Sequence, residues 1–137
     1  MRVVLDTCIL YSALRSSLGA SFHIVSSLPS NKFHPVVSTP LFFEYEEVLQ
    51  RPHQFPHLTA RDIDHVLDFV ASVCEFRRID FLWRPFLPDP DDDLVLEIAV
   101  AGQVDAIVTY NRKDFAGSDR FGIRILSPRD FIKEIKL

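Results

Sequence analysis

Acidic residues are the side chains in this sequence whose type and spacing could support chemistry. Asp6 directly follows the apolar run Val3–Leu5, and consecutive aspartates at 91–93 precede the apolar segment Leu94–Ala101. Like charges held that close raise one another's pKa unless a cation neutralises them. Mg²⁺ is a hard cation that prefers a few carboxylates together with water. The acids therefore predict a divalent-metal site, and a metal bound there would assist hydrolysis of an anionic phosphodiester.

These acids also have structural explanations. Asp6 could cap a helix that begins directly after it. The dipole of a helix favours acids in its first turn by roughly 0.3–1 kcal/mol, which accounts for one or two of the aspartates at 91–93. It does not account for three of them at the start of a buried helix. The cluster is not an EF-hand, because it lacks that loop's glycine and its distal glutamate.

The elements that must position these acids alternate along the chain. Apolar runs predict strands at 3–5, 106–109 and 123–126, and a poorer one at 33–38 that Pro35 interrupts. Helices are expected over 9–16, 20–28, 39–50, 59–74, 94–101 and 129–136. This order predicts an α/β fold, a three-layer α/β/α sandwich with a mainly parallel central sheet. Ligands bind at the carboxyl edge of such a sheet, which is where Asp6 would lie.

The helix expected after the second strand could bring a further acid to that edge. Thr39 and Pro40 predict its start, with a hydroxyl at the N-cap and proline in the first helical position. At about 100° per residue, Glu44 falls on one border of the apolar face and Glu46 on the other. Periodicity alone does not choose between these two glutamates.

The stretch after that helix predicts a surface loop and a second helix start. His53 and His57 have the spacing of a helical metal pair, but Pro56 between them argues against a helix. We therefore expect both histidines at the surface. Thr59 and Asp62 have the spacing of a capping box, which predicts a long helix from that point.

Composition sets the broad class of protein. The chain has 137 residues, of which 47% are hydrophobic and 25% charged, as expected of a single domain spanning 1–137. No apolar stretch could span a bilayer and no signal-peptide pattern is present, so we expect a cytoplasmic protein with no membrane partner. The net charge of −4 leaves the identity of the partner open. Cys8 and Cys74 form no CxxC pair, and we expect packed thiols.

Four segments of the sequence together resemble the PIN-domain nucleases, and within them the VapC-type toxins of toxin–antitoxin systems. They read VVLDTCIL at 3–10, VVSTPLFFEYEEVLQRP at 36–52, LPDPDDDLVLEIAVAGQVDAIVTYNRKDF at 87–115 and IRILSPRDF at 123–131. The segments follow the family's order across nearly the whole chain. The resemblance implies a PIN-like fold and a ribonuclease dependent on Mg²⁺ or Mn²⁺, with RNA as its substrate. It also implies a cognate antitoxin protein as partner and a homodimer.

The resemblance also implies which side chains act. The residues that would be both metal ligands and catalytic residues are Asp6, Glu44, Asp92 and Asp114. Glu44 matches the family better than Glu46 because it lies six residues after Ser38, and Asp92 is chosen by its offset of seven residues from Ala99. The near alternatives are Asp91 and Asp93. The supporting residues would be Thr7, Thr109 and Asn111.

Two departures from the family pattern predict weaker catalysis. Cys8 stands where the family commonly has asparagine, and a thiol is a much weaker hydrogen-bond donor. Asn111 stands at a position that is often aspartate, so it can offer a carbonyl oxygen but no charge. These departures motivate a rival hypothesis, a catalytically weak PIN-like module that binds RNA or a protein partner. A phosphatase with an aspartyl nucleophile ranks last, because such enzymes typically show D-x-D where this chain has Asp6-Thr7-Cys8.

Overall fold

The computed structural model describes residues 1–80 and 86–137. The sequence between the helix expected to end at 74 and the aspartates at 91–93 is a connection, and its Trp83 lies outside the described residues. The strands are β1 (Arg2–Leu5), β2 (His34–Val37), β3 (Glu75–Phe76), β4 (Ala106–Val108) and β5 (Arg124–Leu126). The α-helices are α1 (Thr7–Arg15), α2 (Ala20–Ser26), α3 (Thr39–Leu49), α4 (Ala60–Val73), α5 (Pro90–Ala101) and α6 (Pro128–Ile135). Two short 3₁₀ helices, η1 (Arg112–Phe115) and η2 (Ser118–Phe121), separate β4 from β5.

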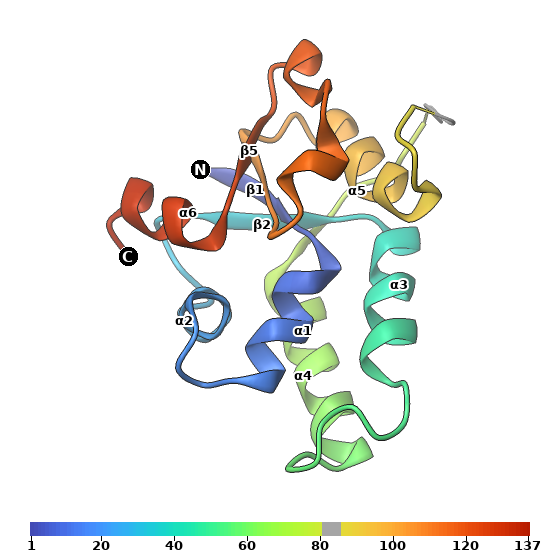
Figure 1. Cartoon of the computed structure of the whole chain (residues 1–137), viewed down its shortest axis with the longest axis vertical. Helices are drawn as coiled ribbons and strands as arrows, with labels where there is room; N and C mark the ends of the chain where they lie inside the picture. Colours follow the sequence, from blue (N-terminus) through green and yellow to red (C-terminus); the bar gives the residue numbers. More distant parts are fainter. Residues whose placement is uncertain (81–85) are drawn as a thin grey trace.

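The strands form one sheet in the order β3-β2-β1-β4-β5, and every neighbouring pair is parallel. β1 lies at the centre, where Val3 pairs with Ala106 and Leu5 with Val108 of β4. All carboxyl ends of the strands therefore lie at the same edge of the sheet. This confirms the predicted α/β fold with a parallel central sheet flanked by helices (Figure 1).

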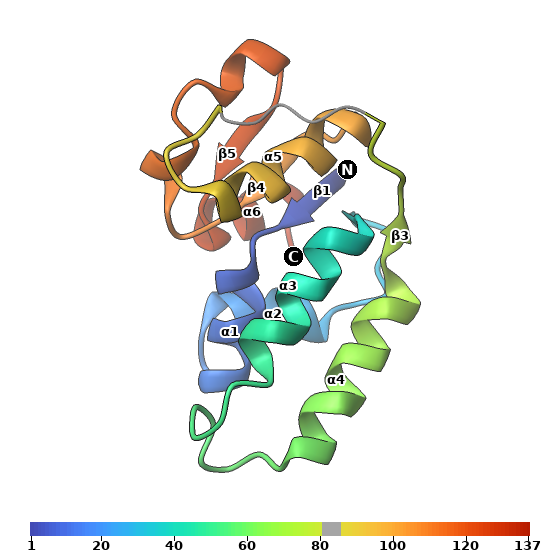
Figure 2. The same cartoon turned by 90° about the vertical axis from the view of Figure 1, so that its right-hand side faces the viewer.

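Two hydrophobic cores cover the two faces of the sheet. Val4 belongs to the core that includes residues of α3, α4 and α5, whereas Val3 and Leu5 belong to a second core with α2 and α6. Side chains of a strand alternate between faces, so a strand buried on both faces needs an unbroken apolar run. Figure 2 shows α3, α4 and α5 gathered on one face, with α3 and α4 side by side.

The helix starts follow local sequence signals, with one correction. Thr59 and Asp62 form the expected capping box at the start of α4. At α3, however, the N-cap is Ser38, whose hydroxyl oxygen accepts a hydrogen bond of 3.1 Å from the N–H of Leu41. The prediction of Thr39 as the cap was wrong by one residue, because Ser38 keeps the extended backbone of β2 while Thr39 is already helical.

Strand β3 was not predicted from the sequence. It has two residues, Glu75 and Phe76, which is too short for a periodic pattern to show. Its position is fixed instead by pairing with β2 and by Arg2 of β1, whose guanidinium donates to both Glu75 oxygens at 2.7 and 2.8 Å.

The histidines of the loop after α3 and the two cysteines differ in their exposure to solvent. His53 and His57 are exposed in the loop after α3, as predicted, and Cys8 and Cys74 are free, partly buried thiols. Over residues 1–80 and 86–137, no helix is long and apolar enough to cross a membrane.

Candidate active site

Asp6 follows the last residue of β1 and is 7% exposed. Its Oδ1 accepts a hydrogen bond of 2.8 Å from the N–H of Thr7, so the residue does cap α1. Its Oδ2 accepts a hydrogen bond of 2.7 Å from the hydroxyl of Thr109, at the carboxyl end of β4. Burial raises the pKa of Asp6, and these hydrogen bonds act against that rise. The carboxylate of Asp6 therefore both caps α1 and contacts Thr109 at the end of β4.

Glu44 reaches the same region from the middle of α3. The hydroxyl of Thr7 donates a hydrogen bond to its Oε2, which joins α3 to the start of α1. Burial raises the pKa of Glu44 to about 7, with further increases from the charges of Asp91, Asp6 and Asp89. The structure therefore brings Glu44 close to Asp6.

The aspartates at the start of α5 have different surroundings. Asp89 is the N-cap of this helix and accepts a hydrogen bond of 2.9 Å from the N–H of Asp91, which is exposed. Asp93 is 1% exposed, and its Oδ1 accepts a hydrogen bond of 2.9 Å from the N–H of Leu87. Asp92 is partly buried, and no donor among the described residues holds its carboxylate.

Asp92 lies close enough to the other acids for their charges to affect its pKa. Burial is the largest cause that raises its pKa to about 7, followed by the charges of Asp6, Asp89, Asp114 and Glu44. We call Asp6, Glu44, Asp92 and Asp114 the acidic cluster. These acids come from four separate segments of the chain and lie near the carboxyl edge of the sheet.

Asp114 and Asn111 lie on the exposed side of the cluster. Asp114 is in η1, and its charge contributes to the raised pKa values of Asp6 and Asp92. Asn111 precedes η1, and its N–H donates to the hydroxyl oxygen of Thr109 at 3.0 Å. Thr109 thus links this segment to Asp6 through its hydroxyl.

The donor chemistry of the acidic cluster fits a hard divalent cation. The candidate ligands offer only oxygen atoms, and the raised pKa values of Asp6, Glu44 and Asp92 reflect burial and repulsion by neighbouring acids. None of the ion pairs formed within residues 1–80 and 86–137 involves a member of the cluster. No group of three or more Asp, Glu, His or Cys side chains among the described residues is arranged to hold a metal ion, so an ion bound here would take part of its coordination from water. An open set of carboxylates suits Mg²⁺ or Mn²⁺, which keeps several waters.

Cys8 contacts the site as a neutral thiol. Its Sγ donates to Oδ2 of Asp6 at 3.5 Å and lies 3.7 Å from the hydroxyl of Thr109. Burial, and then the charge of Asp6, raise the pKa of Cys8 to about 12. At neutral pH the side chain is therefore a weak donor to Asp6.

One contact beside the site could have been anticipated but was missed. Tyr45 was predicted only as part of the apolar face of α3, yet its hydroxyl donates to the carbonyl oxygen of Leu5. The signal was available, because a buried tyrosine usually needs a partner for its hydroxyl. This hydrogen bond holds α3, which carries Glu44, against the end of β1.

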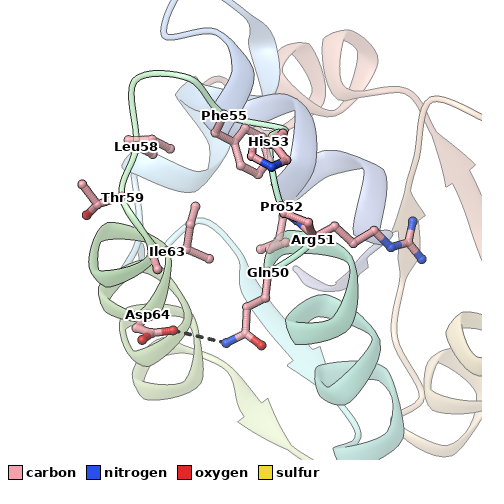
Figure 3. Close-up of a pocket in the computed structure, with 11 residues that line it drawn as sticks. Gln50, Arg51, Pro52, His53, Phe55, Leu58, Thr59, Ile63 and Asp64 are labelled. Carbon is pink, nitrogen blue, oxygen red and sulfur yellow. Dashed lines mark hydrogen bonds between the residues drawn. The ribbon is translucent and has the colours of Figure 1, made fainter.

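A pocket elsewhere in the molecule contains no residue of the acidic cluster. It has a volume of about 270 Å³ and lies where α3 leads into α4 (Figure 3). Phe55, Leu58 and Ile63 give it an apolar side, and Gln50 donates to Asp64 across it at 3.2 Å. The acidic cluster is therefore separate from this pocket.

Comparison with known proteins gives the family. The sequence matches the PIN domain over residues 2–113, whereas no curated protein matches it. Among solved structures, the chain is similar to a chain in the crystal structure of VapBC2 from Rickettsia felis bound to a DNA fragment from its promoter. The TM-score is 0.65 at 16% identity, covering 93% of this chain and 98% of that chain, which shows a shared fold. Because the family match spans most of its length, this chain belongs to the PIN-domain family, whose members are generally nucleases.

Proposed function

We propose that the protein is a metal-dependent endoribonuclease that hydrolyses RNA phosphodiester bonds. The supporting observation is the acidic cluster, in which Asp6, Glu44 and Asp92 all have raised pKa values at the carboxyl edge of a parallel sheet. Carboxylates with no counter-charge in the described structure are suited to a cation. Both the substrate and the leaving group of phosphodiester hydrolysis are anionic, so the same cation would favour the reaction.

In this proposal Asp6, Glu44, Asp92 and Asp114 would hold Mg²⁺ or Mn²⁺. When bound, such an ion lowers the pKa of a water molecule and neutralises charge that develops on the phosphoryl group. Thr109 orients Asp6 through its hydrogen bond. Thr7 does the same for Glu44, so two candidate ligands are held in place by hydroxyl groups. Asp92, which no described donor holds, is available to orient the attacking water.

The proposed partners rest on the family resemblance and on the fold. The similar chain belongs to a VapBC2 complex, which supports a cognate antitoxin as the protein partner of this chain. We propose that the protein is the toxin of such a pair, forms a homodimer and acts in the cytoplasm. The rival function is a catalytically weak PIN-like module that binds RNA or a protein partner. Cys8 favours this rival, because its thiol is a weak donor to Asp6.

The test is a cleavage assay on structured and single-stranded RNAs with Mg²⁺, with Mn²⁺ and with chelator. The variants Asp6→Asn and Asp92→Asn remove one charge each from the cluster, and Asp68→Asn removes an exposed charge from α4 as a matched control. We expect cutting that requires metal, is lost in the first two variants and survives in the third. Thermal unfolding of every variant shows that each is folded.

Two results would contradict the proposal. Cutting that survives both Asp6→Asn and Asp92→Asn would place the activity outside the acidic cluster. Absence of cutting by the unsubstituted protein, together with measurable binding of RNA, would favour the weak binding module.

A further inference from the structure

Tyr110 is the residue directly after Thr109, at the carboxyl end of β4. Its hydroxyl lies 2.7 Å from the hydroxyl of Ser21 in α2 and accepts a second, longer hydrogen bond of 3.4 Å from Ser12 in α1. Ser21 is fully buried. Two helices thus hold the outer end of the tyrosine side chain.

Although its hydroxyl is held, Tyr110 is 48% exposed. The hydroxyl contacts Ser12 and Ser21. An exposed fraction of this size must include part of the aromatic ring. An aromatic ring fixed at its outer end has little rotamer freedom left to lose when a ligand covers it. This ring is therefore organised in advance for contact with a flat, apolar partner.

The backbone of Tyr110 lies next to the acidic cluster. Thr109, which precedes Tyr110 in the chain, donates a hydrogen bond of 2.7 Å to Oδ2 of Asp6. The N–H of Asn111, which follows Tyr110, donates to the hydroxyl oxygen of Thr109 at 3.0 Å. Tyr110 thus lies between two residues that are tied to Asp6, one by a direct hydrogen bond and one through Thr109.

The charge of the site makes an uncharged contact useful. Without a bound cation the cluster repels phosphate groups, and the whole chain carries a net charge of −4, so contacts that do not depend on charge would add to the affinity for RNA. Base–aromatic stacking contributes affinity that this charge does not oppose. Only an unpaired base can offer its face to a side chain in this way.

We propose that Tyr110 stacks against an unpaired base of single-stranded RNA next to the bond that is cut. This inference rests on the proposed ribonuclease function and specifies its substrate as single-stranded at that nucleotide. Ser12 and Ser21 are positioning residues, because they orient the ring and do not contact RNA. The alternative is a purely structural role, in which Tyr110 only links α1 and α2 to the end of β4. That role needs the hydroxyl of the tyrosine but does not need its ring to be exposed.

The experiment measures binding of a labelled single-stranded RNA by fluorescence anisotropy with Mg²⁺, in the Asp6→Asn background so that the RNA stays intact. Tyr110→Ala should weaken binding roughly 5- to 150-fold, the range for loss of one stacked base. Tyr110→Phe keeps the ring but loses the hydroxyl that Ser12 and Ser21 hold, so it should weaken binding much less than Tyr110→Ala. Phe69→Ala removes an aromatic residue on α4 that is 38% exposed, and should also bind like the parent.

An abasic position moved along the RNA locates the stacked base. One abasic substitution should weaken binding to the parent but not to Tyr110→Ala, and thermal unfolding checks that each variant is folded. Equal binding by Tyr110→Ala and its parent would overturn the inference, and so would an equal loss in Tyr110→Phe. The nuclease function survives either result if the unsubstituted protein cuts RNA. If neither the parent nor any variant bound RNA, both the stacking role of Tyr110 and the proposed ribonuclease function would be overturned.

Discussion

The hydroxyl of Thr109 donates a hydrogen bond of 2.7 Å to Oδ2 of Asp6, between residues that lie 103 positions apart in the sequence. The sheet makes this contact possible, because Leu5 of β1 pairs with Val108 of β4 and the two residues that follow lie side by side. The hydrogen bond stabilises the charged form of a buried carboxylate. A parallel sheet therefore brings together an acid and the donor that keeps it ionisable.

Replacing Thr109 with valine should weaken binding of Mn²⁺ roughly 10- to 100-fold, the range observed when a hydrogen-bond partner of a metal ligand is removed. Burial already raises the pKa of Asp6, and loss of the donor would raise it further, so protons would compete better with the ion. Thr109→Ser keeps the hydroxyl and should retain most of the affinity. Calorimetric titration at two pH values tests this, since the valine deficit should be larger at the lower pH. A deficit that is the same at both values would contradict proton competition.

Substitutions of Asp92 and Asp93 should affect different properties. Asp93→Ala should lower the free energy of unfolding by about 1–3 kcal/mol, because the N–H of Leu87 loses its buried acceptor. Asp93→Asn keeps an acceptor oxygen and should lower it less. Asp92→Asn should abolish cleavage without this loss of stability, since no described donor depends on its carboxylate. Urea unfolding measures the stability of these variants, and the cleavage assay measures their activity. Asp93 would become the preferred ligand if Asp93→Asn abolished cleavage at unchanged stability.

The stability of the metal-free protein should fall as the pH rises from about 5 to about 8. The pKa values of Glu44 and Asp92 are both raised to about 7, from ordinary values of 4.5 and 3.8. Between the ordinary and the raised values, the folded protein keeps protons that the unfolded chain releases. The stabilisation from these protons is complete below the ordinary pKa and is lost as the pH passes through about 7.

Urea unfolding in chelator at both pH values measures this effect. Asp92→Asn has no proton to lose at this position, so its stability should fall less over the same range. Mg²⁺ should restore stability to the unsubstituted protein at the higher pH, because the ion replaces the protons as counter-charge. A stability that rises with pH in chelator would show that these carboxylates are ionised in the folded protein.

Tyr45→Phe should lower the free energy of unfolding by about 1–3 kcal/mol, because the buried carbonyl of Leu5 loses its donor. Tyr11→Phe is the matched control, since this partly buried ring packs on Phe55 at 5.3 Å and donates no hydrogen bond to any described residue. The control should change stability by less than about 0.5 kcal/mol. Thermal or urea unfolding measures both. Equal losses in the two variants would show that the Tyr45 hydroxyl is not what holds α3 to β1.

Local sequence signals predicted most of the fold. The unbroken run Val3–Leu5 predicted a strand buried on both faces, and the spacing of Thr59 and Asp62 predicted the start of α4. Such signals work because burial patterns and caps depend on residues close together in the chain. β3 escaped prediction, because two residues show no period and its position depends on pairing with β2 and on Arg2.

The sequence by itself identified the acids and, through its motifs, the PIN-domain family. Only the tertiary structure showed what surrounds each acid. Asp93 accepts a hydrogen bond from a backbone N–H, and Glu44 accepts one from the hydroxyl of Thr7. No described residue donates a hydrogen bond to the carboxylate of Asp92. No local signal marked Tyr110, because the partners of its hydroxyl, Ser12 and Ser21, lie in α1 and α2 and are remote in the sequence. The physical reason is that burial, charge repulsion and hydrogen-bond partners depend on distance in space, and most of these partners are remote in the sequence.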